Sequence, residues 1–192
     1  MFGKRGMRLV FTLLSVVAFA SVEAALQQDT VKGEEQPVVL LKKGDKMPDY
    51  VFKDLNGKRV SLKSFRGKYV YIDLWATWCT SCIEQTPYFE KLEEEFHNKK
   101  IVFVSISVDR HREVWERLVK AEKKRILQWV CPEGEKAPIL RDFGILTIPR
   151  FILLDKKGRI LESNFGMPAW SQKRRCPNWM VFENDKILNE WI

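Results

Sequence analysis

The chain has 192 residues, of which 45% are hydrophobic, and it contains 12 Phe and 7 Trp. This length suggests one compact domain with peripheral segments, and the apolar content excludes an intrinsically disordered chain. The formal net charge is +8, but Lys and Arg are scattered among Glu and Asp, as in residues 120–125, which is typical of a solvated helix face. The one tight basic cluster is at 173–175, and no nucleic-acid-binding module is present, so we expect no nucleic-acid partner.

Residues 1–24 have the three parts of a secretory signal. Three positive residues within the first eight precede an apolar run over 9–20, and Val22-Glu23-Ala24 is an A-x-A-like cleavage site. An uncleaved anchor is the alternative, but the run is shorter than the ~20 residues a spanning helix needs. We therefore expect an exported protein, periplasmic or secreted, with no stable membrane insertion after cleavage. The segment 25–43, polar over 27–36, is then a leader, and removal of three positive residues and Glu23 with the signal lowers the formal net charge to +6.

The first elements after the signal predict strands. An apolar run at 38–41 indicates an edge strand, and runs at 50–55 and 59–62 flank Asn56-Gly57, a strong hairpin signal. The nearly continuous apolar run at 69–75 is typical of a buried parallel strand. Helical spacing follows over 81–96, where Pro87 should introduce a kink.

The second half continues the alternation of strands and helices, which predicts a mixed α/β sheet. The tail 166–192 shows no clear period, although 181–192 is compatible with a short helix. We expect strands at 101–108, 126–130, 151–154 and 159–162, and helices at 113–123 and 137–143, the last stopped by Gly144.

The candidate chemistry is a C-x-x-C pair, Cys79 and Cys82, placed where a buried strand passes into a helix. Unpaired N–H groups at a helix N-terminus stabilise a thiolate there, and two intervening residues let the second sulfur reach the first. Cys79 is therefore the predicted attacking thiolate, and Cys82 the thiol that resolves the mixed disulfide. A zinc site would need further ligands, which the remaining His and Cys residues are not spaced to supply, so we expect no metal and no cofactor.

Residues 73–87 resemble the active-site segment of the thioredoxin superfamily, and Trp-Ala-Thr-Trp-Cys at 75–79 resembles its exported TlpA/ResA-like branch. The segment 44–50 is similar to the Gly-x-x-x-Pro-x-Phe element of that branch, and 147–158 is similar to its cis-proline loop and next strand. The resemblance covers about residues 44–163. It implies a thioredoxin-like fold, with a central mixed β-sheet flanked by helices and an N-terminal β-hairpin extension, over a domain that we place at 44–165.

The resemblance also implies a function. The chain would be a thiol–disulfide oxidoreductase that exchanges disulfides with protein thiols, in the reducing direction, and receives electrons from a membrane-bound thiol reductant. Pro149 matches the cis proline, which leaves the backbone of Ile148 free to pair with an extended substrate next to Trp78. The dipeptide Thr80-Ser81 differs from the Gly-Pro of thioredoxin, and Arg150 stands where a small polar residue is common, which could bias the choice of substrate.

Asp73 matches the buried acid of thioredoxin. In so apolar a strand its pKa should be raised, and it could relay a proton for Cys82. The alternative is a structural strand acid with no part in the chemistry.

Two other function classes share this fold. A thiol peroxidase would want a Thr-x-x-Cys arrangement, whereas Thr77 lies only two residues before Cys79. A non-catalytic binding module would not need both cysteines. The remaining pair, Cys131 and Cys176, could form a second disulfide or remain free thiols, and the sequence leaves both open.

Overall fold

The computed structural model describes residues 40–122 and 125–168 of the chain. The predicted signal segment, most of the leader, and the tail from residue 169 onward, including the helix predicted at 181–192, lie outside the described residues. Within the described ranges, no helix is both long and apolar enough to span a bilayer.

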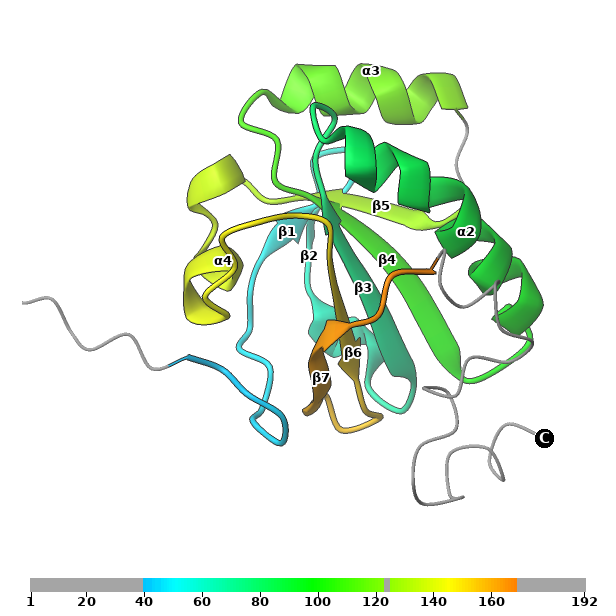
Figure 1. Ribbon diagram of the computed structural model, residues 1–192, viewed down its shortest axis with the longest axis vertical. Helices are drawn as coiled ribbons and strands as arrows, with labels where there is room; N and C mark the ends of the chain where they lie inside the picture. Colours follow the sequence, from blue (N-terminus) through cyan, green and yellow to red (C-terminus); the bar gives the residue numbers. More distant parts are fainter. Residues whose placement is uncertain (1–39, 123–124, 169–192) are drawn as a thin grey trace, which may run out of the picture. The chain divides into compact units, whose positions relative to one another are not determined.

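A seven-stranded mixed sheet forms the centre of the described region, in the order β2-β1-β5-β4-β3-β6-β7 (Figure 1). This confirms the predicted thioredoxin-like α/β fold. The strands are β1 (Phe52–Lys53), β2 (Arg59–Val60), β3 (Tyr69–Trp75), β4 (Ile101–Ser107), β5 (Leu127–Val130), β6 (Arg150–Leu154) and β7 (Ile160–Phe165).

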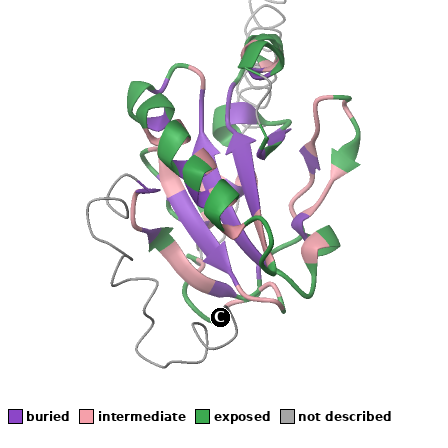
Figure 2. Ribbon diagram, turned by 90° about the vertical axis from the view of Figure 1, so that its right-hand side faces the viewer, coloured by how far each residue is buried: buried purple, intermediate pink, exposed green. Residues whose placement is uncertain are grey.

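β3 lies inside the sheet and carries the chain to the cysteine pair. It runs parallel to β4 and antiparallel to β6, and each of its seven residues is buried. The apolar run is nearly continuous because both faces of this strand are covered, as the sequence predicted. Figure 2 shows the same contrast, with buried strands and outward helix surfaces that are exposed.

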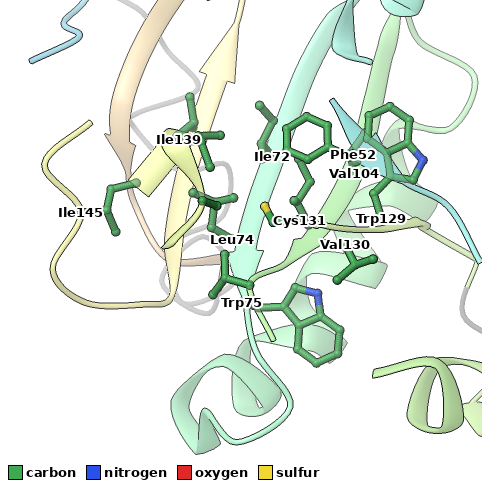
Figure 3. Close-up of a cluster of buried hydrophobic side chains, with 14 of the residues drawn as sticks. Phe52, Ile72, Leu74, Trp75, Val104, Trp129, Val130, Cys131, Ile139 and Ile145 are labelled. Atoms are coloured by element: carbon green, nitrogen blue, oxygen red, sulfur yellow. The ribbon is translucent and has the colours of Figure 1, made fainter. Parts of the chain in front are cut away.

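Helices cover both faces of β3. Tyr71 meets the ring of Phe89 from α2 (Thr80–Phe96), with ring centroids 5.0 Å apart. Ile72 and Leu74, which alternate with Tyr71 along the strand, pack instead in a cluster with Ile139 of α4 (Pro138–Asp142) (Figure 3). Because successive strand residues point to opposite faces, α2 and α4 lie on opposite sides of the sheet.

An aromatic cluster fills the α2 side. Its centre is Tyr71, whose ring also lies 5.6 Å from Phe103 of β4 and 5.2 Å from Phe165 of β7 by centroid distance. Burial, followed by the charge of Asp73, raises the pKa of Tyr71 well above its usual value. The Tyr71 hydroxyl nevertheless donates to the Gly166 carbonyl at 3.2 Å, which satisfies the group within the core.

The predicted hairpin at Asn56-Gly57 is present but short. β1 and β2 pair antiparallel through two residues each, and β1 joins the main sheet next to β5. Asp54 explains the turn, because its Oδ1 accepts hydrogen bonds from the N–H groups of Asn56 and Lys58, each at 2.9 Å.

One predicted strand was wrong in its described part, and two short helices were missed. Residues 40 and 41 of the strand expected at 38–41 are not in a strand; instead Leu41 N–H donates to the Asp142 carbonyl at 2.8 Å. The missed elements are 3₁₀ helices, η1 (Leu62–Phe65) and η2 (Gly134–Lys136), which follow turns rather than an apolar period. The remaining helix, α3 (Arg112–Glu122), buries Trp115 and Val119 as its amphipathic pattern predicts.

Candidate active site

Cys79 and Cys82 form a disulfide at the start of α2, with an S–S distance of 2.04 Å and Cα atoms 5.2 Å apart. Cys79 is the N-cap residue of the helix, and its Sγ accepts a hydrogen bond from Cys82 N–H at 3.2 Å. The Ser81 hydroxyl lies 3.5 Å from the same sulfur. Polar hydrogens thus converge on Cys79 Sγ, which is the arrangement that stabilises a thiolate when the pair is reduced.

The two cysteines differ in exposure. Cys79 is 6% exposed and Cys82 is 1% exposed, while Trp78, directly before the pair, is 59% exposed. Both cysteines are therefore buried, Cys82 more completely than Cys79, and the exposed Trp78 directly precedes them.

A second loop reaches the pair from the start of β6. The peptide bond between Ile148 and Pro149 is cis, and the Ile148 carbonyl oxygen lies 3.7 Å from Cys79 Sγ. β6 lies beside β3 in the sheet, so the loop before β6 and the link after β3 meet at the same edge. The geometry brings Ile148 to the redox pair from a point 69 residues away in the sequence.

Asp73 lies inside β3 and is 5% exposed. It is on the same face of the strand as Tyr71, which contacts α2, so its side chain lies on the side of the sheet that the cysteine-bearing helix covers. Its Oδ2 accepts a hydrogen bond from Ser105 Oγ at 3.3 Å, across the β3–β4 register.

A polar cluster around Thr77, which is close to the pair in sequence, was not predicted from the sequence. Asp109, two residues beyond β4, is 5% exposed and accepts hydrogen bonds from Thr77 and Ser107. A recognisable signal was present, since an acid directly after a buried parallel strand lies at the same sheet edge as the residues following β3. The Thr77 hydroxyl donates to Asp109 Oδ1 at 2.7 Å.

Cys131 is not part of this site. Its sulfur forms no disulfide with another described residue, and the residue is 3% exposed within the hydrophobic cluster of Figure 3. Burial, and to a lesser extent the charge of Glu133, raises its pKa to about 12. Cys176 lies outside the described residues, so the Cys131–Cys176 disulfide stays a prediction.

The Redoxin family description matches residues 42–173, more than half of the chain. The chain belongs to the Redoxin family. Among its relatives in this superfamily, the thiol-disulfide oxidoreductase ResA of Bacillus cereus is 27% identical over 156 residues, which cover 81% of this chain and 86% of ResA. The thioredoxin-like protein YneN of Bacillus subtilis is 31% identical over 126 residues, covering 66% and 73% of the two chains.

Solved structures of thiol-disulfide oxidoreductases have a similar fold. The crystal structure of a putative thiol-disulfide oxidoreductase from Bacteroides vulgatus superimposes with a TM-score of 0.62 at 36% identity, covering 67% of this chain and 89% of the other. Together with the Cys79–Cys82 disulfide, these similarities identify the chain as a thioredoxin-fold, ResA/TlpA-like thiol–disulfide oxidoreductase.

Proposed function

We propose that this Redoxin-family chain is an exported protein-disulfide reductase in which Cys79 attacks and Cys82 resolves. The observation that carries the proposal is the position of Cys79 as the N-cap of α2, with its sulfur facing the Ile148 carbonyl. Cys79 is the less deeply buried residue of the pair, and its sulfur accepts the Cys82 N–H hydrogen bond. The reduced pair would therefore hold its thiolate at Cys79.

The exchange proceeds in two displacements. The Cys79 thiolate attacks one sulfur of a client disulfide, so that a Cys79–client bond forms, the client S–S bond breaks, and the other client sulfur leaves as a thiolate that takes up a proton. Cys82, once deprotonated, attacks Cys79 Sγ and releases the second client sulfur, which is also protonated. Two electrons pass from the pair to the client, and the Cys79–Cys82 disulfide forms.

Asp73 is the proposed base for Cys82. This role is supported by its burial and by its place on the β3 face that α2 covers, since α2 carries Cys82 within its first turn. A buried carboxyl group has a higher affinity for a proton than an exposed one, so it can accept the Cys82 proton and return it in the next cycle.

Trp78, Ile148 and Pro149 are the proposed client-binding residues. Trp78 offers an exposed apolar surface beside Cys79, and the Ile148 backbone stands within 3.7 Å of the attacking sulfur. An extended client segment paired with Ile148 would present its sulfur to Cys79. Arg150, partly buried at the start of β6, would favour clients with acidic residues near the cysteine.

Export and the electron source complete the proposal. The signal-like residues 1–24 support a periplasmic or secreted location, where the natural electron source for a reductase is a membrane-bound thiol reductant. Fractionation with amino-terminal sequencing of the mature protein tests the location, and thiol trapping of Cys79 and Cys82 in cells tests the direction. A mostly oxidised pair in cells would reverse the proposed direction.

The chemical roles are tested by single-cysteine variants. We expect Cys79→Ser and Cys82→Ser each to abolish catalysed reduction of insulin disulfides by dithiothreitol, and only Cys82→Ser to accumulate client mixed disulfides on non-reducing gels. In the reduced wild-type protein, Cys79 should be alkylated at a lower pH than Cys82, with a thiol pKa about one unit lower or more.

Cys131→Ser is the matched control, because its thiol lies outside the site and should not be needed for turnover. Faster alkylation of Cys82 at low pH would overturn the assignment of roles. Activity in either active-pair variant would overturn the dithiol mechanism, and an inactive wild-type protein would point to a binding module.

A further inference from the structure

Asp109 is hydrogen-bonded to Thr77, which precedes the redox pair in the chain, and to Ser107. Its Oδ1 accepts from the Thr77 hydroxyl at 2.7 Å, and its Oδ2 accepts from Thr77 N–H at 3.0 Å and from the Ser107 hydroxyl at 2.6 Å. Asp109 N–H in turn donates to Ser107 Oγ at 3.0 Å. A carboxyl group this buried is costly unless it is hydrogen-bonded, and here both oxygens have donors.

Thr77 lies in the link that places Cys79. β3 ends at Trp75 and α2 begins at Thr80, so Ala76, Thr77 and Trp78 are the only residues between the strand and the N-cap. The link turns tightly, because Cys79 N–H donates to the Ala76 carbonyl at 3.1 Å. Fixing Thr77 at both its N–H and its hydroxyl therefore fixes where Cys79 begins the helix.

The Asp109 end of this connection is rigid as well. Val108 N–H donates to the Trp75 carbonyl at 2.9 Å, and Cys131 N–H donates to the Ser107 carbonyl at 2.8 Å. Gly134 packs so closely that a Cβ there would come within 3.0 Å of the Asp109 carbonyl oxygen. Backbone hydrogen bonds thus hold Ser107 and Val108, the two residues before Asp109, while the Asp109 side chain holds Thr77.

We propose that Asp109 is a positioning residue of the redox site, which acts through Thr77 to keep Cys79 Sγ on the first N–H groups of α2. The inference rests on the proposed role of Cys79 as the attacking thiolate. If the link loosens, the Cys82 N–H to Cys79 Sγ hydrogen bond weakens, and this bond favours the thiolate of the reduced form. Loss of Asp109 should therefore raise the Cys79 pKa and make the disulfide harder to reduce.

Asp109→Asn tests this, because the amide has nearly the same shape but keeps one oxygen acceptor in place of two. We expect the equilibrium constant for reduction of the Cys79–Cys82 disulfide by glutathione to fall about threefold or more. That factor corresponds to about 14 mV toward a more negative potential, at 29.6 mV per tenfold change. The alkylation pKa of Cys79 should rise in parallel.

Thr77→Val removes the hydroxyl but keeps the N–H. It should therefore lower the equilibrium constant for reduction and raise the Cys79 alkylation pKa, each by less than Asp109→Asn does. If Asp109→Asn does not fold, the Thr77→Val variant alone tests whether the Asp109–Thr77 hydrogen bond affects Cys79. The double variant should show less than the sum of the two shifts, because both act on one connection. Asp155→Asn is the matched control. Asp155 Oδ1 also accepts two backbone N–H hydrogen bonds, each at 2.8 Å, but it lies in the turn between β6 and β7, which does not carry the cysteines. It should change neither quantity.

Folded Asp109→Asn and Thr77→Val proteins with unchanged Cys79 pKa and potential would overturn the inference. A shift of the same size in Asp155→Asn would overturn it too, because the effect would then be general. The proposed function fails separately, since alkylation of Cys82 before Cys79 in the wild-type protein refutes the cysteine roles whatever these variants do.

Discussion

At the scale of single residues, the site depends on small differences in environment between similar groups. Cys79 and Cys82 are three positions apart, yet one caps a helix and the other lies inside its first turn. Asp73 and Asp109 are both 5% exposed, but the first lies in the middle of a strand and the second follows one. Their hydrogen-bond partners accordingly differ, and so do the roles proposed for them.

Asp73→Asn should remove the proposed proton acceptor for Cys82 while leaving the fold intact. Because the amide cannot accept the Cys82 proton, we expect release of a client from its Cys79 mixed disulfide to slow by about 100-fold, the lower end of general-base contributions. Quenched-flow analysis of a preformed mixed disulfide measures this step. Ser105→Ala is the control, since it removes the hydroxyl that donates to Asp73 and leaves the acid in place. An unchanged rate from about pH 6 to 9, around the usual thiol pKa, would exclude Asp73 from the mechanism.

The residue roles that depend on local sequence were open to prediction. The strand-to-helix passage around Cys79 and the Thr-Ile-Pro motif are both visible in consecutive residues. Asp109 was not found, because its meaning depends on which strand ends lie side by side, 32 residues apart in the chain. The position of Asp109 directly after a predicted parallel strand was a signal for the sheet edge, but the strand end that it faces is set by sheet order, which periodicity does not encode.

At the scale of elements, burial on both faces made the central strands predictable. The apolar runs predicted β3 and β4 to within one residue, and helical spacing predicted α2 and α3. The sequence did not indicate that β5 lies between β4 and the β1–β2 hairpin, because non-local pairing leaves no mark in one strand's own composition. The 3₁₀ helices were missed since they are too short to show a period.

Gly134 tests the packing of η2 against the segment after β4. It has φ +56°, and a Cβ would meet the Arg110 Cα at 2.9 Å. We expect Gly134→Ala to lower the free energy of unfolding by about 2–4 kcal/mol, from left-handed backbone and steric overlap together. Gly44→Ala is the matched control, since φ there is +92° with nothing within 4 Å, and it should cost about 1–2 kcal/mol. Urea unfolding measures both, and equal losses would exclude a packing role for η2.

At the scale of the whole molecule, the described region has two hydrophobic clusters. The aromatic one around Tyr71 lies against α2, and the larger one includes Cys131 and Trp129, with Trp129 stacked on Phe52 and Phe65. Both clusters bury a group that ionises only at high pH, Tyr71 in one and Cys131 in the other. High pH should therefore destabilise both hydrophobic clusters.

We expect stability to fall as the pH rises from about 9 to 12. The folded Cys131 thiol keeps its proton up to a pKa of about 12, whereas an unfolded thiol loses it near 8.5, so the unfolded state is favoured between these values. Oxidised protein unfolded by urea at several pH values should show this decline, and Cys131→Ala should make it shallower by up to about 1.4 kcal/mol per pH unit. Equal slopes in the two proteins would contradict a buried free thiol and favour its disulfide with Cys176, since a bonded sulfur has no proton to lose.

The irregular pairing of β6 and β7 has a consequence for association between molecules. The register between the two strands shifts twice, between Phe151 and Leu153 and again between Leu153 and Leu154, and β7 is the outer strand of the described sheet. Bulges of this kind bend a strand and increase its twist, so its outer edge does not present a flat, evenly spaced row of amide and carbonyl groups. The outer edge of β7 is therefore a poor template for pairing with a strand of another polypeptide or of a second copy of this chain.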